Sequence, residues 1–142
     1  MKSSSSPEHT PPSVPNPTSL QRWVSNPSLL AQTVIQALED IKAKDIEQLE
    51  VRTLTSLFDT LIIASADSTR QTRALARHVE DQVRALGAPI LSTDGQHSGE
   101  WILVVLGSVI VHIMQPAVRT YYDLTTLWQR PGNRLEAPPR AA

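Results

Sequence analysis

The sequence predicts an α/β (α+β) domain with a mixed β-sheet of about five strands and helices packed on it. Helix-like and strand-like apolar patterns follow one another in the order α-β-β-α-β-β-β-α. Short links join two pairs of the strand-like segments, which is typical of antiparallel hairpins. A long helix-like segment separates the second strand from the third, so one crossover can place two strands parallel.

The first helix is expected from about residue 27. Asn26 or Ser28 can cap it, and Pro27 is tolerated in its first turn. One helical face carries the apolar residues Leu30, Val34, Leu38 and Ile41. Residues 45–52 are then expected to form a strand with acidic residues at one edge. Residues 57–65 are expected to form a second strand that is apolar enough to be central.

The clearest helix lies between Ser68 and Gly87. Ser68 and Gln71 fit an S-x-x-Q capping box, in which each side chain bonds a free backbone N–H of the first turn. Gly87 occupies the position that ends many helices, with Pro89 just beyond it. The buried stripe is expected to be Leu75, Val79, Val83 and Leu86.

The last third of the chain contains most of the sheet. The expected elements are a short strand at 88–93, a polar loop at 94–100, strands at 101–106 and 109–114, and one final helix at 116–128. Gly107 and Ser108 separate the last two strands and form a plausible tight hairpin turn.

The composition divides the chain into three parts. Residues 1–26 are Ser- and Pro-rich and cannot bury enough apolar surface to offset the entropy of ordering, so disorder is expected. Residues 27–129 form the domain, and residues 130–142 are expected to be a disordered tail. A transit peptide is the alternative for the first part, but Arg is absent before Arg22 and Glu8 is present.

Length, cysteine content and hydropathy exclude several classes of protein. With 142 residues and no Cys, the chain suits one domain without disulfides, in a reducing compartment such as the cytoplasm. Location in an organelle is the alternative to the cytoplasm. No apolar stretch reaches the roughly 20 residues of a membrane helix, and no secretory signal is visible. A membrane partner is therefore not expected.

The charge is unevenly distributed. The whole chain has a net charge of −1, but residues 27–128 contain eight Lys and Arg against twelve Asp and Glu. A domain that binds RNA mainly through phosphates normally carries a basic face. Nucleic acid is therefore not expected as the main contact, although a local basic patch is compatible with these totals.

The loop at 94–100 brings Asp94, His97, Ser98 and Glu100 within seven residues. These residue types also form catalytic triads, but triad members usually converge from separate segments that each hold one side chain in place. Neighbours in one loop rarely reach that geometry. A polar binding loop is the favoured interpretation.

Cofactor motifs are missing. The histidines at positions 9, 78, 97 and 112 have no zinc-ligand spacing among them, and there is no Cys to complete a site. Neither a P-loop nor a G-x-G-x-x-G pattern is present. No metal and no cofactor are expected.

Trp101 and His112 are the two residues that could mark a binding surface. Trp101 begins a strand directly after a polar loop, where it could be packed in the core or anchor an interface, since Trp is frequent among interface anchors. His112 lies inside the apolar run VIVHIM. It is either a neutral histidine hydrogen-bonded in the core or a polar member of a docking face beside Trp101.

Four motifs together carry a resemblance to a known family. They are S-x-R-Q at 68–71, G-x-x-x-x-x-W from Gly95 to Trp101, V-H-I-M-Q at 111–115 and R-x-Y-Y-D-L-x-x-L-W at 119–128. In this order, from about Leu30 to Trp128, the chain resembles the ribosomal silencing factor family, also called iojap-like. The resemblance implies a nucleotidyltransferase-like fold.

The resemblance also implies a function without catalysis. Members of this family dock on the large ribosomal subunit through ribosomal protein L-fourteen, block joining of the small subunit and lower translation in starvation. Free members can form homodimers, and relatives occur in mitochondria and chloroplasts. Two alternatives stay open, namely a large-subunit assembly factor and a degenerate nucleotidyltransferase-like enzyme.

The chain departs from the family at two positions. Family members often carry acids where this sequence has Val105 and Ser108. Binding to basic groups would then depend on Asp94 and Glu100 instead. Nucleotidyl transfer needs paired carboxylates that hold Mg²⁺ on the phosphates, and no such pair follows Gly107 and Ser108. An enzyme is therefore not expected.

One contact surface is predicted from these arguments. Its members are Asp94, Gly95, Ser98, Glu100, Trp101, His112, Gln115, Arg119 and Tyr122. Arg70 and Gln71 belong to the family motif and are added to it. They also have a structural interpretation, in which Gln71 closes the capping box and Arg70 pairs with an acid such as Asp59.

Overall fold

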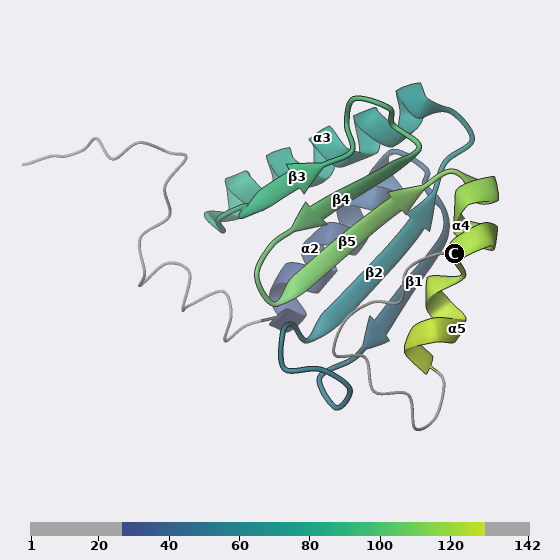
Figure 1. The fold of residues 1–142 in the computed structure, drawn as a ribbon. Helices are drawn as coiled ribbons and strands as arrows, with labels where there is room; N and C mark the ends of the chain where they lie inside the picture. The colour runs from purple at the N-terminus through teal and green to yellow at the C-terminus, as the bar shows by residue number, and fades with distance from the viewer. Residues whose placement is uncertain (1–26, 130–142) are drawn as a thin grey trace, which may run out of the picture.

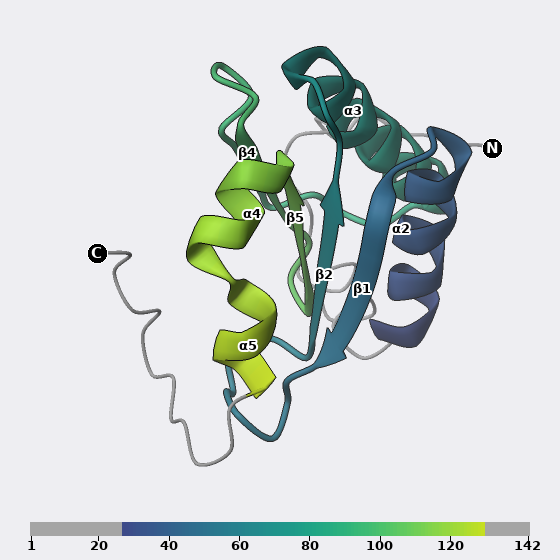
Figure 2. The same cartoon turned by 90° about the vertical axis from the view of Figure 1, so that its right-hand side faces the viewer.

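The computed structural model describes residues 27–129. The elements in chain order are α2 (Pro27–Asp40), β1 (Lys44–Glu50), β2 (Thr60–Ser65), α3 (Thr69–Leu86), β3 (Ser92–Asp94), β4 (Trp101–Val105), β5 (Val109–Met114), α4 (Pro116–Tyr122) and α5 (Leu124–Gln129). Helices α2 and α3 cover one face of the sheet, and α4 and α5 lie against the other (Figures 1 and 2). The predicted α+β class is confirmed. None of the described helices has both the length and the apolar character that crossing a membrane requires.

The sheet is mixed and five-stranded, with the strand order β1-β2-β5-β4-β3. Strands β2 and β5 pair parallel, and the other three pairs are antiparallel. The two predicted hairpins, β1–β2 and β4–β5, are therefore confirmed. The chain passes through α3, β3 and β4 before β5 comes to lie beside β2. All six residues of β2 are buried, which agrees with the central position that its apolar sequence predicts.

Two apolar clusters lie on the two faces of the sheet, because successive side chains of a strand point to opposite sides. The larger cluster joins α2 and α3 to residues such as Ile102, Val104 and Val111. The smaller one joins Leu61 and Met114 to α5, and it includes Val51, Ile63, Leu124 and Trp128. The second cluster is what holds α5 against the sheet.

The predicted limits of α3 are confirmed, but only half of the capping box forms. The Ser68 hydroxyl accepts the backbone N–H of Gln71, and Gly87 ends the helix in the left-handed region with φ 88°. The Gln71 side chain does not close the box. Its Nε2 donates instead to the carbonyl oxygen of Ile41 at 3.2 Å, just after the end of α2. Carbonyls at helix C-termini lack partners within the helix, so Gln71 supplies one and joins α2 to α3.

Two strands are shorter than the sequence predicts. Strand β2 begins at Thr60 rather than at residue 57, since Phe58 packs on the ring of Trp128 instead (centroids 5.5 Å apart). Strand β3 covers Ser92–Asp94 rather than residues 88–93. The preceding segment contains Pro89, which has no N–H to donate to a sheet ladder.

The predicted final helix is broken in two at Asp123. This residue lies in the left-handed region with φ 49°, and its N–H donates to the Arg119 carbonyl at 2.8 Å. Aspartate tolerates this conformation better than most residues. The break allows Leu124 and Trp128 to enter the second apolar cluster while α4 keeps its own direction.

Replacing Trp128 with Ala should remove most of the contact that holds α5. Truncation of a buried Trp costs about 3–5 kcal/mol, so the midpoint of thermal unfolding should fall by more than about 10 °C. Circular dichroism during heating measures this. The exposed neighbour Gln129 is the control, and Gln129→Ala should change the midpoint little. Equal effects of the two substitutions would contradict the assigned core.

Candidate functional site

Part of the sheet face opposite α2 and α3 is not covered by the described helices. Along β4, Ile102 and Val104 are fully buried, whereas Trp101, Leu103 and Val105 on the other side remain partly exposed. Strand pairing adds Asp94, Ile110 and His112 to this side. Figure 1 shows this face toward the viewer, with α4 and α5 set to one side of β3 and β4. We call these six residues the open sheet face.

A group of aromatic rings lies where the open sheet face meets α4. Trp101 packs on Tyr122 with ring centroids 4.7 Å apart, and Tyr122 contacts Tyr121 edge-on at 5.0 Å. Trp101 also donates its indole N–H to Nδ1 of His112 at 2.9 Å. Tyr121 is 69% exposed, so the cluster reaches from the sheet to the surface. We call Trp101, His112, Tyr121 and Tyr122 the aromatic cluster.

His112 combines the two interpretations that the sequence left open. It is partly buried and hydrogen-bonded, and it also borders Trp101 on the open sheet face. Burial lowers the pKa of His112 to about 4, so the ring is neutral at pH 7. Since Nδ1 accepts the indole N–H, the ring proton must be on Nε2. The neutral ring thereby fixes the orientation of Trp101.

The loop between β3 and β4 depends on two glycines. Gly95 has φ 90°, and a Cβ at this position would lie 2.1 Å from the carbonyl oxygen of Trp101. Gly99 is buried with φ 78°, and its Cβ would meet the side chain of Thr69 at 2.8 Å. The chain therefore passes closely over the start of β4 and the first turn of α3, which fixes the loop beside Trp101.

Arg73 of α3 holds the same loop from the other side. Its Nε donates to the carbonyl of Gln96 at 2.8 Å, and Nη2 donates to the carbonyls of His97 at 2.7 Å and Ser98 at 3.3 Å. The sequence analysis did not identify this residue. No local signal separates Arg73 from the other arginines of α3, because its role depends on which loop lies beside the helix.

The polar loop contains no assembled catalytic group. Asp94, His97, Ser98 and Glu100 are all exposed, and the Ser98 hydroxyl accepts the backbone N–H of Glu100 at 3.2 Å. Within residues 27–129, no hydrogen bond joins the side chains of Asp94, His97 and Ser98 to one another. The same part of the chain holds no group of three or more His, Cys, Asp or Glu side chains placed to bind a metal ion.

Gln115 ties the aromatic end of the sheet to the link between β2 and α3. Its N–H donates to the carbonyl of Glu100 at 3.0 Å, and its side-chain amide donates to the carbonyl of Asp67 at 3.0 Å. It is partly exposed beside the open sheet face. The structure thus gives Gln115 an internal bonding role in addition to the predicted contact role.

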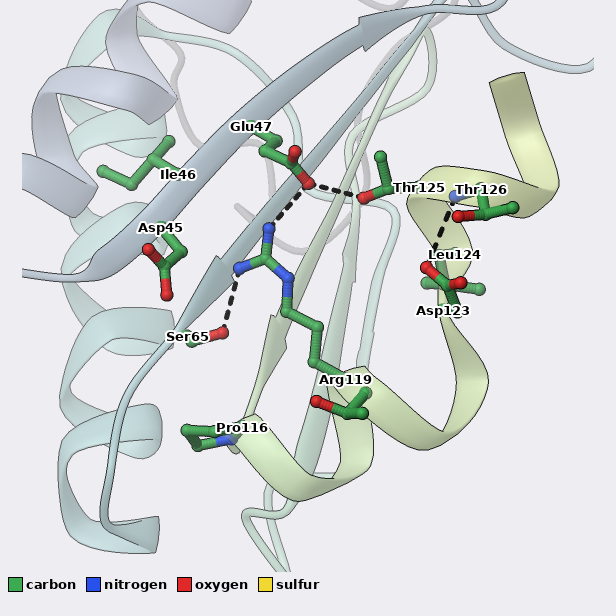
Figure 3. A pocket seen from close by; sticks show the side chains of 11 residues that line it. Asp45, Ile46, Glu47, Ser65, Pro116, Arg119, Asp123, Leu124, Thr125 and Thr126 are labelled. Carbon is green, nitrogen blue, oxygen red and sulfur yellow. Dashed lines mark hydrogen bonds and ion pairs between the residues drawn. The ribbon is translucent and has the colours of Figure 1, made fainter. Parts of the chain in front are cut away.

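Arg119 lies apart from the open sheet face. Its guanidinium donates to Glu47 of β1 at 2.7 Å and to the Ser65 hydroxyl at 2.9 Å, and only 16% of its side chain is exposed. Figure 3 shows these contacts inside a groove of about 730 Å³ between β1, β2 and the last two helices. A hydrogen bond from Thr125 and the nearby Arg119 lower the pKa of Glu47. The ion pair joins α4 to β1, and the Thr125 hydrogen bond to the same carboxylate adds a polar contact of α5.

The alternative interpretation, in which Arg70 pairs with an acid such as Asp59, is wrong for Asp59. Asp59 precedes β2, whereas Arg70 follows its far end in the first turn of α3. A six-residue strand is about 20 Å long, which separates the two side chains. Arg70 is exposed and forms no ion pair with any residue in the range 27–129.

Val105 and Ser108, where the sequence resemblance led us to expect acids, have different surroundings. Val105 is partly exposed on the open sheet face, so an acid there would add charge to that surface. Ser108 is buried in the β4–β5 turn, and its carbonyl accepts the N–H groups of Asp59 and Thr60 at 2.9 and 3.0 Å. Only position 105 therefore changes the charge of the open sheet face directly.

The fold and the site define a small α+β domain that presents a partly open sheet face, an aromatic cluster and an acidic loop. Its residues 24–141 match the sequence model of a family described as "Ribosomal silencing factor during starvation". The chain belongs to this ribosomal silencing factor family, as its sequence motifs predict.

Individual relatives agree with this assignment. The ribosomal silencing factor RsfS of Chromobacterium violaceum is 50% identical over 99 residues, which are 70% of this chain and 81% of the relative. A crystal structure of a protein from the same organism superposes with a TM-score of 0.70 at 46% identity, covering 80% of this chain and 93% of that one. The mouse protein named "Mitochondrial assembly of ribosomal large subunit protein 1" is 28% identical over 98 residues, 67% of this chain and 43% of the relative.

Replacing Gly95 with Ala should displace the loop that borders Trp101. The clash with the Trp101 carbonyl is with backbone, so we expect a loss of more than about 3 kcal/mol in the free energy of unfolding, measured by urea titration. Gly87→Ala is the control, since Gly87 also has a positive φ but open space around its Cβ position. It should cost only about 1 kcal/mol. A smaller loss for Gly95→Ala than for Gly87→Ala would refute the proposed close contact.

Replacing His112 with Gln should flatten the pH dependence of stability. The folded pKa is depressed to about 4, so the unfolded state binds the extra proton as the pH falls from about 6.5 toward 4. In that window the free energy of unfolding of the wild type should fall by about 1.4 kcal/mol per pH unit more than that of the variant. Urea titrations at several pH values measure the difference. Parallel pH profiles would show that His112 is not buried in its neutral form.

Proposed function

We propose that this protein represses translation by binding the large ribosomal subunit through ribosomal protein L-fourteen and blocking joining of the small subunit when nutrients are short. The observation that carries the proposal is the open sheet face with the aromatic cluster at its edge. Membership in the ribosomal silencing factor family supports the ribosomal partner. A protein that blocks subunit joining needs no chemical reaction. It needs only a stable surface that covers the site where the small subunit would bind.

The chemistry of this surface suits a basic ribosomal protein. Trp101 offers a large apolar contact, and partly exposed Leu103 and Val105 extend it along β4. Asp94 and Glu100 border it with negative charge, which attracts a basic partner and repels RNA phosphates. A stable contact of this kind buries about 1,200–2,000 Å² in total.

The surface is also held ready for binding. Trp101 is fixed by His112 and Tyr122, and the adjacent loop is fixed by Arg73. Side chains that are ordered before binding lose less conformational entropy when the partner docks. This rigidity supports a docking role for the aromatic cluster over a purely internal one.

We propose further that the protein is not an enzyme. The side chains of Asp94, His97 and Glu100 are exposed and unconnected, so nothing positions them for nucleotidyl transfer. An assay with Mg²⁺ and each nucleoside triphosphate should give no turnover. Turnover that disappears in Asp94→Asn would instead favour the degenerate nucleotidyltransferase.

Assembly of the large subunit is the second candidate. The printed name of the mouse relative assigns that protein to the assembly of the mitochondrial large subunit. The same surface could serve either role, because both begin with docking on the large subunit. Adding pure protein to mature subunits separates them. A repressor should lower the yield of whole ribosomes, whereas a pure assembly factor should leave it unchanged.

The free protein is proposed to reside in the bacterial cytoplasm, where the related RsfS proteins of bacteria would meet ribosomes. The family resemblance also implies that free chains can pair as homodimers. A second copy could cover the open sheet face in the absence of a subunit, because that face carries partly exposed apolar side chains. Formation of the homodimer would then compete with docking on the large subunit.

Replacing Trp101 with Ala should weaken binding to large subunits by about 30-fold or more, since buried aromatic anchors contribute 2 kcal/mol or more to an interface. Co-sedimentation with purified subunits measures the affinity. Leu57→Ala is the control, because Leu57 is 70% exposed in the β1–β2 loop.

Leu103→Lys tests the same face if Trp101→Ala proves unstable, since it places a charge on the apolar side of β4 and leaves Trp101 itself in place. It should also reduce binding. Unchanged affinity in both folded variants, or no co-sedimentation of the unsubstituted protein, would refute the proposed function.

A further inference from the structure

One side of α3 carries an unusual concentration of positive charge. Spacings of three, four and seven residues place four arginines along one side of this helix. They are Arg70, Arg73, Arg77 and Arg84. These four make up half of the eight Lys and Arg residues between positions 27 and 128, a region with twelve acids. We call them the arginine seam.

The arginine seam runs beside the edge strand of the sheet. On the same helix, Glu80 accepts a hydrogen bond from Thr93 of β3 at 2.6 Å. Arg73 bonds the loop that follows β3. In Figure 1, α3 follows the β3 edge along its length. The seam is therefore continuous with the border of the open sheet face.

Three of the four arginines have charge available for a partner. Arg70 and Arg77 are exposed and form no ion pair within residues 27–129. Arg84 approaches Asp81 at 3.6 Å, but 61% and 59% of the two side chains are exposed, so this pair is open to water. The other nearby acid, Glu80, is occupied by Thr93. Arg73 is occupied by the loop carbonyls.

We propose that the arginine seam contacts RNA phosphates of the large subunit beside the protein docked on the open sheet face. This proposal rests on the proposed function. Arginine binds phosphate with paired N–H groups, and the helix rises by about 21 Å from Arg70 to Arg84, enough to meet several phosphates. The main contact remains a protein, and the RNA contact is a second one at its border.

The dependence of subunit binding on salt concentration tests the seam. The logarithm of the association constant falls linearly with the logarithm of the salt concentration. Each arginine–phosphate contact makes this slope more negative by about 0.7–0.9. Fluorescently labelled full-length protein is titrated with purified large subunits between 50 and 200 mM KCl. The double variant Arg70→Gln/Arg77→Gln should show a slope that is less negative by about 1.5, with the larger loss of affinity at low salt.

A matched pair of single variants controls for the loss of charge. Arg77→Gln should make the slope less negative by about 0.8, whereas Arg52→Gln should leave it unchanged. Arg52 is exposed and lies just after β1, away from α3. Equal slopes for wild type and the double variant would overturn the proposal, as would equal effects of the two single substitutions.

Cross-linking identifies the class of partner. The chain contains no Cys, so Ala74→Cys gives a single attachment point for a photoreactive group. Ala74 is exposed on α3 between Arg70 and Arg77. Irradiation of the complex should yield a cross-link that ribonuclease removes. Cross-links to ribosomal proteins alone would overturn the proposal.

The two proposals fail in different ways. If the unsubstituted protein does not bind large subunits, the proposed function and the seam proposal are both overturned. If binding requires Trp101 but is indifferent to Arg70 and Arg77 at every salt concentration, only the seam proposal is overturned.

Discussion

The sheet has two apolar faces, and the described chain covers them unequally. Helices α2 and α3 extend over one face, whereas α4 and α5 lie on the other face over β1, β2 and one end of β5, and reach β4 only at its start, where Tyr122 packs on Trp101. The side chains of β4 therefore alternate between full burial at Ile102 and partial exposure at Leu103. Burial of apolar area is the main driving force of folding, so an incompletely covered face suits a partner that completes it. The candidate site lies on the sheet face that the helices cover incompletely.

Features determined by neighbouring residues could be predicted from the sequence. The Ser68 cap, the Gly87 terminus and the two hairpins depend on local backbone chemistry, and all of them are confirmed. The order of elements and the central position of β2 followed from apolar periodicity. The break at Asp123 was missed because no Gly or Pro marks it, and the energy gained by packing α5 decides it.

Features determined by distant neighbours could not be predicted in the same way. The acceptors of Gln71, Arg73 and Arg119 lie 23 to 72 residues away in sequence, so their roles appear only when the fold brings these segments together. The pairing of Arg70 with Asp59 failed for the same reason. His112 could be predicted in part. The sequence placed it in an apolar strand, but it left open whether the ring is hydrogen-bonded in the core or lies on the surface beside Trp101.

The contacts of Arg73 have a mechanical consequence. They join α3 to the loop beside Trp101, so the arginine seam and the open sheet face belong to one body. Two surfaces on one body can be engaged together only by targets at a fixed mutual distance. A free ribosomal protein would offer one such target, and an assembled subunit would offer both. The protein would then bind the assembled subunit more tightly than the free ribosomal protein. Once the open sheet face has docked, the arginine seam meets its own target at a high effective concentration.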